Sequence, residues 1–247
     1  KFSELGDILQ HLQNKYPDRH SAFHDIRLKG HANRHMMSAL NETNLRRVLK
    51  IMLDPDEFLG DHGIRSISKR HENEPYRFAH NQQDYVVKYL PAESDSGLFG
   101  GNSNWRGPIW MPVNFMILRA LIVYFCYYGK DFKVEFPTGS GQTANLYEVA
   151  ENLAHRLASI FTRNDEGRRP VFGSQETFQN DPNWQDYLLF YEYFHGDNGA
   201  GIGASHQTGW SGLVVNLIHY FAHNNQATRL ELGSNTGPLL HGRHGNR

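Results

Sequence analysis

Apolar residues recur every three or four positions along several stretches of the chain, which is the spacing of amphipathic helices. The clearest stretch runs from Thr143 to Phe161, where one apolar stripe is separated from polar positions such as Glu148 and Arg156. A second helix is predicted from Pro112 to Tyr128, because a proline lies near its first turn and Gly129 follows its last residue. This second stretch is apolar on most sides, so we expect it to be deeply buried.

Three further helices are expected, over Leu45–Leu53, Trp210–Ala222 and, from a weaker pattern, Leu5–Tyr16. The polar residues from Asn41 to Thr43 would start the first of these helices, and Pro55 would end it. Two long segments, residues 54–104 and 163–207, carry few periodic runs. Because loops of this length inside a compact domain are usually functional, the pattern predicts a mainly α fold whose functional residues lie between the helices.

Composition and charge narrow the classes of protein to consider. With 247 residues, of which 39% are hydrophobic, the chain can bury a sizeable core. Residues 233–247 are rich in Ser, Asn, Gly, Pro and His, so they are expected to form a flexible tail after residues 1–232. The 25 basic and 26 acidic side chains give a net charge of −1, which creates no long-range field to gather a polyanion. We therefore expect no nucleic-acid partner.

The apolar stretch from Met111 to Gly129 is interrupted by a proline, an asparagine and an arginine, which leaves it short of the roughly 20 apolar residues of a membrane span. We therefore expect no membrane partner. Cys126 is the single cysteine, so an intrachain disulfide cannot form, and a reducing, cytoplasmic location is favoured. No charged and then apolar leader begins at Lys1, so a secretory signal is expected to be absent or already removed.

A glycine-rich run leads into two tryptophans and an arginine between Phe99 and Trp110, in the order FGGNSNWRGPIW. Such a run places the rigid faces of Trp105 and Trp110 and the bidentate donor Arg106 just before a predicted helix, where a ligand can be held. A structural turn whose tryptophan rings cover the core is the alternative. No Gly-Lys-Ser or Gly-Lys-Thr follows the glycines, which makes a nucleotide-binding loop an improbable interpretation.

A lone carboxylate lies among aromatic residues in the segment from Phe190 to Phe194, FYEYF. Glu192 in this setting suits general acid or base chemistry, and an extended segment would present its side chain from a short strand. Asp197 is the nearby alternative for the same role. Pairing of Glu192 with an arginine such as Arg106 is the purely structural alternative.

Two weaker candidates are less specific. Glu93 and Asp95 lie two residues apart in a turn-like stretch, which would suit an acid pair or a hard cation but is more often a solvated turn. His31 and His35 have the i, i+4 spacing of zinc ligands on a helix, as do His20 and His24, yet both pairs lack the glutamate beside the first histidine. We therefore expect no metal and no cofactor.

Four of these runs together resemble glycoside hydrolase family 63. They are residues 93–110, residues 191–210, residues 63–68 and residues 132–141, and the run WRGPIW within the first is the most specific. That family includes processing α-glucosidase I, the mannosyl-oligosaccharide glucosidases and bacterial hydrolases of small α-glycosides. The resemblance spans roughly residues 45 to 222.

The resemblance implies an (α/α)6 toroid with an inverting active site among the loops at one mouth, of which residues 1–232 would supply the C-terminal half of the catalytic domain. In an inverting mechanism a general base activates a water molecule while a second carboxylic acid protonates the leaving oxygen. The family's general base falls on Glu192. The candidate substrate-binding residues are Phe99, Trp105, Arg106, Trp110, Tyr191, His206, Gln207 and Trp210.

The family's general acid is an aspartate upstream of the tryptophan-rich run, and its position would lie before Lys1. We therefore expect the chain to be part of a longer enzyme that acts on an oligosaccharide or a small α-glycoside, with the remainder of the same catalytic domain as its partner. The 247 residues alone are expected to be inactive. The alternative is a non-catalytic helical domain that binds carbohydrate or a protein through the same aromatic residues.

Overall fold

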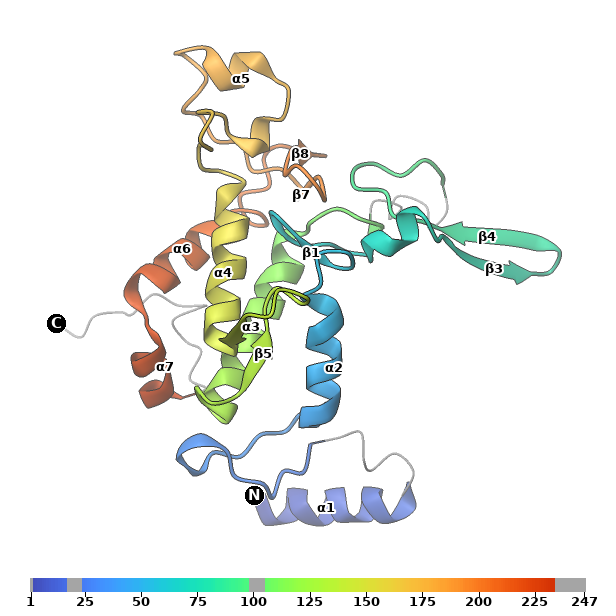
Figure 1. The fold of residues 1–247 in the computed structure, drawn as a ribbon, viewed down its shortest axis with the longest axis vertical. Helices are drawn as coiled ribbons and strands as arrows, with labels where there is room; N and C mark the ends of the chain where they lie inside the picture. The colour runs from blue at the N-terminus through green and yellow to red at the C-terminus, as the bar shows by residue number, and fades with distance from the viewer. Residues whose placement is uncertain (1, 17–23, 98–104, 234–247) are drawn as a thin grey trace.

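The computed structural model describes residues 2–16, 24–97 and 105–233 (Figure 1), and helices dominate that part of the chain. The α-helices are α1 (Phe2–Lys15), α2 (Glu42–Met52), α3 (Met111–Tyr128), α4 (Leu146–Ser159), α5 (Glu176–Asn180), α6 (Leu213–His223) and α7 (Gln226–Leu232). Short strands form antiparallel pairs: β1 (Leu59–Gly60) with β2 (Gly63–Ile64), β3 (Tyr76–His80) with β4 (Gln83–Val87), β5 (Lys133–Glu135) with β6 (Thr143–Asn145), and β7 (Tyr193–Phe194) with β8 (Gly201–Ile202). The prediction of a mainly α fold is confirmed.

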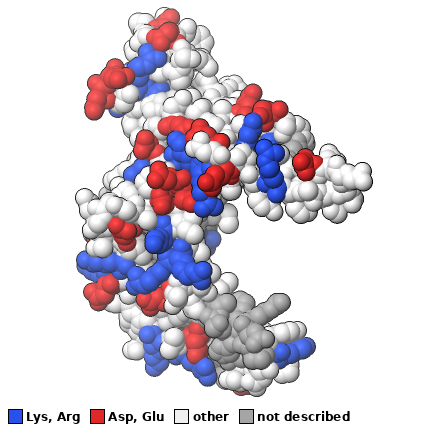
Figure 2. All heavy atoms as spheres, turned by 45° about the vertical axis from the view of Figure 1, so that its right-hand side comes forward, with Lys and Arg blue, Asp and Glu red and all other residues white. Residues whose placement is uncertain are grey.

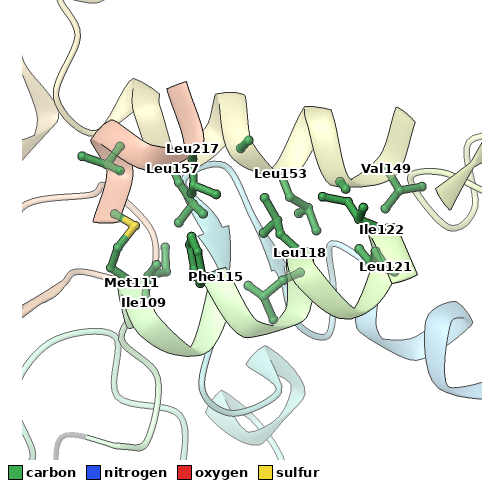
Figure 3. Close-up of a cluster of buried hydrophobic side chains, with 14 of the residues drawn as sticks. Ile109, Met111, Phe115, Leu118, Leu121, Ile122, Val149, Leu153, Leu157 and Leu217 are labelled. Atoms are coloured by element: carbon green, nitrogen blue, oxygen red, sulfur yellow. The ribbon is translucent and has the colours of Figure 1, made fainter. Parts of the chain in front are cut away.

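The core forms where α3 and α4 lie side by side and antiparallel, with α6 packed across them (Figures 1 and 3). Leu118 and Ile122 of α3 and Leu153 and Leu157 of α4 are fully buried in this cluster. Each such side chain contributes about 1.5–3 kcal/mol by leaving water. The expected deep burial of α3 holds for half of the helix, and the face with Val113 and Met116 is exposed.

The predicted helix from Thr143 to Phe161 is right in its body and wrong at its ends. Residues Thr143–Asn145 pair with β5 as a strand, and the helix begins only at Leu146. The Asn145 side chain accepts from the backbone N–H groups of Tyr147 and Glu148, and the Glu148 carboxylate accepts from the Asn145 N–H. This reciprocal capping box starts the helix three residues later than the apolar pattern indicates.

Two other predicted helices are also shifted. The helix expected from Leu45 begins at Glu42, because Asn41 caps it by accepting from the Asn44 N–H at 2.8 Å. The helix expected from Trp210 begins at Leu213, because residues 208–212 form turns. The Trp210 ring is thereby left in a loop instead of on a helix surface.

The two long segments between helices contain short structured elements. Strands β3 and β4 form a hairpin that projects from the rest of the molecule (Figure 1), and its turn places Asn81 and Gln82 at positive φ. The segment after α4 contains α5, β7 and β8.

On the face drawn in Figure 2, basic and acidic side chains are interspersed, as the net charge of −1 leads one to expect.

Among the described residues, α3 is long and apolar enough to cross a membrane by length and composition. Half of the 18 residues of α3 are buried within the protein, and the helix packs against α4, α6 and α7. We therefore interpret α3 as a core helix. The (α/α)6 toroid stays a prediction, and the expected tail over residues 234–247 lies outside the described residues.

Candidate functional site

Three aromatic side chains form a stack, which we call the aromatic column: Trp105, Trp110 and Tyr193. The rings of Trp105 and Trp110 are nearly parallel, with centroids 4.1 Å apart and an interplanar angle of 8°. Tyr193 stacks on Trp110 with centroids 4.9 Å apart. Trp110 is therefore 4% exposed, whereas Trp105 at the end of the column is 39% exposed. In this conformation Trp105 is the member that offers a large ring surface to a ligand.

Trp210 connects the column to the predicted general base. Its ring meets the Trp110 ring edge-on, with centroids 6.3 Å apart, and its indole N–H donates to the main-chain oxygen of Glu192 at 3.0 Å. The Glu192 side chain is half-buried, and its carboxylate accepts from the Ala204 N–H at 3.4 Å. The structure thus brings together Trp105, Trp110, Trp210 and the main chain of Glu192.

Backbone pairing explains why the column forms. Ile109 and Phe194 exchange two hydrogen bonds, N–H to oxygen, at 2.8 and 3.0 Å. Because neighbours of a paired position in antiparallel backbone also lie opposite one another, this bridge places Trp110 against Tyr193. The chain bends at Glu192, so the strand begins at Tyr193 and the extended segment predicted from Tyr191 is shorter than expected.

The backbone at Gly196 lies close to two other segments, at Pro91 and at Gly107. The Gly196 N–H donates to the Pro91 oxygen at 2.7 Å. A Cβ atom on Gly196 would lie 2.5 Å from the Tyr89 hydroxyl and 2.7 Å from the Gly107 oxygen. The position therefore requires glycine because no side chain fits between the segments.

Asp197 is the centre of a polar network between three segments. Its Oδ1 accepts from the Tyr89 hydroxyl at 3.0 Å and from Lys69 Nζ at 3.1 Å, and it pairs with buried Arg65 at 3.5 Å. Burial opposes ionisation of this carboxyl, but the hydrogen bonds from Lys69 and Tyr89, together with the positive charges of Lys69 and Arg65, outweigh burial and hold its pKa below the ordinary value. A carboxylate kept ionised in this way is poorly suited to the role of general acid.

The predicted Glu93 and Asp95 pair lies in an exposed turn. Asp95 forms an ion pair with Lys88, and the hydrogen bond from Lys88 lowers the pKa of this carboxyl. Arg106 is 4% exposed and donates to the hydroxyls of Ser94 and Ser96 in the same turn. In this structure Arg106 therefore orders the turn beside the column, and its role as a substrate clamp stays a prediction.

The remaining predicted substrate residues take different positions. Tyr191 is buried in the hydrophobic core, and His206 is exposed where its backbone pairs with Phe190. The Gln207 N–H donates to the Phe190 oxygen at 2.7 Å, which fixes the loop that carries Trp210. Phe99 lies outside the described residues, so its assignment is a prediction only.

The histidine pairs do not adopt the helical arrangement that their spacing suggests. A short 3-10 turn covers His31–Asn33, with Ala32 at a φ of 52°, and the His35 ring bonds to the Ile26 oxygen. His24 bonds to the Tyr127 hydroxyl, and its partner His20 lies outside the described residues. Within the described ranges, no group of three His, Cys, Asp or Glu side chains is placed to hold a metal ion.

Sequence reasoning did not find the contribution of four residues to this site. The sequence indicates Tyr193 only as part of the aromatic surroundings of Glu192, and it does not indicate Arg65, Lys69 and Tyr89 as partners of Asp197. The available signals are the two runs of the family resemblance that include Arg65 and Tyr193, residues 63–68 and residues 191–210.

The family model of the mannosylglycerate hydrolase MGH1-like glycoside hydrolase domain matches residues 35–211, which contain the aromatic column, Glu192 and Trp210. The chain belongs to this glycoside hydrolase family. The chain is also 50% identical over 192 residues to the uncharacterized protein YMR196W of Saccharomyces cerevisiae, a match that covers 77% of the chain and 18% of the relative.

Two further relatives agree with this assignment. The mannosyl-oligosaccharide glucosidase of Saccharomyces cerevisiae is 26% identical over 73% of this chain and 16% of the relative. The probable mannosyl-oligosaccharide glucosidase of Schizosaccharomyces pombe is 27% identical over 70% of the chain and 15% of the relative. The predicted relationship to glycoside hydrolase family 63 is confirmed. The matched region spans less than a fifth of the length of each of these relatives.

Proposed function

We propose that this chain supplies the general base and the sugar-contacting aromatic residues of an inverting α-glycosidase. The observation that carries the proposal is the double contact of Trp210, which touches Trp110 with its ring and holds the Glu192 main chain with its N–H. A loop that carries a carboxylate and is held beside a column of aromatic rings can offer one sugar both a general base and a stacking surface.

The column supports binding of an uncharged, hydroxyl-rich ligand. Trp105 is stacked on Trp110 by one face and is partly exposed, so its free surface can receive the C–H face of a sugar ring. Arg106 and His206 would be donors to hydroxyl groups nearby. The substrate class that we propose is an oligosaccharide or a small α-glycoside.

Glu192 is proposed to take a proton from the water that attacks the anomeric carbon, while a second carboxylic acid gives a proton to the leaving oxygen. In inverting enzymes the two carboxyl groups lie about 6.5–9.5 Å apart, which leaves room for that water. Asp197 and Asp95 are held ionised by Lys69 and Lys88, which supports an acid from another part of the same catalytic domain. We propose an (α/α)6 toroid completed by that part.

Hydrolysis needs only the glycoside and water and changes no oxidation state, so we propose no redox cofactor or nucleotide. The one cysteine among the 247 residues supports a reducing, cytoplasmic location as a further part of the proposal.

Substitution Glu192→Gln in the full-length protein tests the function. We expect turnover to fall by about 10²–10⁴-fold, because the amide cannot accept the proton, while sugar binding is retained. The matched control is Glu166→Gln, at an exposed carboxylate in the turn that follows α4. NMR of the first released sugar should show inversion of the anomer. Turnover above half the parental value in Glu192→Gln would refute the base assignment, and binding without hydrolysis by the parent would indicate the binding-domain alternative.

A further inference from the structure

Glu192 and Gly203 face one another just beyond the paired residues of β7 and β8. In this hairpin, which lies next to the N-terminal end of α3 (Figure 1), Tyr193 is opposite Ile202. One step outward along both strands therefore places Glu192 opposite Gly203. Residues opposite each other in antiparallel backbone have Cβ atoms about 4.5–5.5 Å apart, so a side chain at position 203 would compete with Glu192 for space.

The Glu192 carboxylate occupies the room that a side chain at position 203 would take. A Cβ atom on Gly203 would lie 2.7 Å from Glu192 Oε2, 3.0 Å from Glu192 Cβ and 3.1 Å from Tyr193 Cε1. Non-bonded carbon atoms prefer separations of about 3.5–4.0 Å, so the added atom would crowd both neighbours. Because Oε2 ends a flexible side chain, the carboxylate would be the group that moves aside. Position 203 therefore borders both the proposed base and a ring of the aromatic column.

The backbone conformation of Gly203 brings a hydrogen-bond donor to the same carboxylate. Its φ is 80°, in the left-handed region that residues with a Cβ rarely adopt. The chain bends here directly after β8, and the next N–H, that of Ala204, donates to Glu192 Oε2 at 3.4 Å. Among the residues that the structure describes, no other hydrogen bond reaches the Glu192 carboxylate. The backbone of residues 203–204 therefore supports one oxygen of the proposed base and leaves the other unbound within the described residues.

The turn between β7 and β8 is held from outside, which keeps the two facing residues in register. Asp197 in this turn accepts from Lys69 at 3.1 Å and from the Tyr89 hydroxyl at 3.0 Å. A slip of one residue would move every side chain of a strand to its other face, and it would break these bonds. The polar network at Asp197 therefore helps to keep Glu192 opposite Gly203.

We infer that Gly203 is a positioning residue for Glu192, an inference that rests on the proposal that Glu192 is the general base. The side-chain-free backbone at Gly203 and the Ala204 N–H hold Oε2, and Oε1 takes the proton from the attacking water. As that proton moves to Oε1, the water oxygen bonds to the anomeric carbon, and the bond from this carbon to the leaving oxygen breaks. The second carboxylic acid gives its proton to the leaving oxygen.

The length of the hydrogen bond to Oε2 agrees with this role. At 3.4 Å it is longer than the usual 2.7–3.2 Å of an N–H···O bond. Catalytic hydrogen bonds are often long in a protein without substrate and shorten in the complex. The close fit of Gly203 against the Glu192 side chain therefore limits where the carboxylate can lie before the substrate arrives.

Gly203→Ala and Gly203→Asn in the full-length protein test the inference by steady-state kinetics on an α-glycoside. We expect kcat to fall about 10- to 100-fold in both variants, with KM within about threefold, because the carboxylate is displaced while the sugar contacts remain. Asn adopts positive φ more readily than most residues, so Gly203→Asn separates crowding of the carboxylate from backbone strain. Gly167→Ala is the matched control, since Gly167 has a φ of 77° and nothing within 4 Å of its Cβ position. Its kcat should stay within about twofold of the parental value.

A double-mutant cycle with Glu192→Asp adds a readout that a loss of stability alone would not move. Glu192→Asp shortens the side chain by one methylene, which leaves room for a Cβ atom at position 203. Two independent substitutions multiply their effects on kcat, whereas substitutions of residues in contact do not. We expect kcat of the double variant Glu192→Asp, Gly203→Ala to be at least about threefold higher than the product of the two single effects.

A kcat of Gly203→Ala equal to that of Gly167→Ala would overturn the inference, and so would independent effects in the cycle. Recovery of kcat in Gly203→Asn would assign the loss to backbone strain and would also overturn it. Urea unfolding checks that each variant is folded, and if Gly203→Ala is not, Gly203→Asn and its own cycle with Glu192→Asp decide. Failure of the proposed function is distinct, because it appears as retained turnover in Glu192→Gln.

Discussion

Trp210 donates its indole N–H to the main-chain oxygen of Glu192 at 3.0 Å, across a separation of 18 residues. The bond orients the loop that carries the proposed base, while the Trp210 ring rests against Trp110. One side chain therefore sets the position of Glu192 relative to the proposed sugar platform. This relationship gives the first prediction.

Trp210→Phe keeps an aromatic ring against Trp110 and removes the N–H donor. Loss of one hydrogen bond of about 0.5–1.5 kcal/mol should lower kcat of the full-length protein by roughly 2- to 10-fold, with a smaller change in KM, because Glu192 is less well oriented. Steady-state kinetics on an α-glycoside measures both constants. Trp184→Phe, at a distant exposed tryptophan, is the control, and an equal effect there would refute a specific role for Trp210.

Gly196→Ala should destabilise the junction of the two site loops. The added Cβ would lie 2.5 Å from the Tyr89 hydroxyl and 2.7 Å from the Gly107 oxygen, so the backbone must move at a cost of about 1–3 kcal/mol. Urea unfolding, followed by tryptophan fluorescence, measures the change. Gly209→Ala is the matched control, since nothing lies within 4 Å of its Cβ position, and it should leave the midpoint nearly unchanged.

Asp197→Asn should lower the free energy of unfolding at neutral pH by about 1–3 kcal/mol, because buried Arg65 and half-buried Lys69 lose their carboxylate partner. The pKa of Asp197 is lowered in the folded state, so its contribution is complete above the ordinary value of 3.8 and is lost as pH falls through the folded pKa. The difference between parent and variant should therefore shrink below about pH 4. A difference that is constant from pH 7 to pH 2.5, or that is matched by exposed Asp165→Asn, would contradict this account.

His62 should make stability depend on pH in the weakly acidic range. Burial lowers the pKa of His62 below its ordinary value of 6.5, and its ring bonds to the Ser159 hydroxyl at 3.1 Å. As pH falls through 6.5 the unfolded chain binds a proton that the folded chain does not, so the free energy of unfolding decreases. His62→Gln should flatten this slope between about pH 5 and 7, whereas exposed His155→Gln should leave it unchanged. An unchanged slope in His62→Gln would assign the dependence to other groups.

Local patterns along the chain were enough to predict the helical core. The apolar stripe through Leu146, Leu153 and Leu157 predicts the body of α4 because a helix of this length must bury one face. The start of α4 could not be predicted in the same way. Thr143 has the right spacing for the stripe, but it is used by a strand that pairs with Glu135 eight residues earlier.

The candidate site was predicted in part. The resemblance of the runs around Trp105 and Glu192 to a glycoside hydrolase family was sufficient to select these loops, and most of the residues named for the site lie in them. Their individual surroundings were not predictable. Trp110 and Tyr191 are both buried in this structure, one in the column and the other in the core, although both were expected to contact substrate.

What the sequence by itself determined is therefore the helical core, the family and the two loops that carry the site, because these depend on local periodicity and on motifs within a few residues. Only the tertiary structure decided that Trp105 alone among the column presents a large ring surface, that Trp210 holds Glu192, and that Asp197 is bound to Lys69 and Tyr89. The physical reason is that these contacts join residues 18 to 128 positions apart, whose approach is set by the β7–β8 pairing between Glu192 and Trp210 and by the packing of α3 and α4 between Lys69 and Asp197.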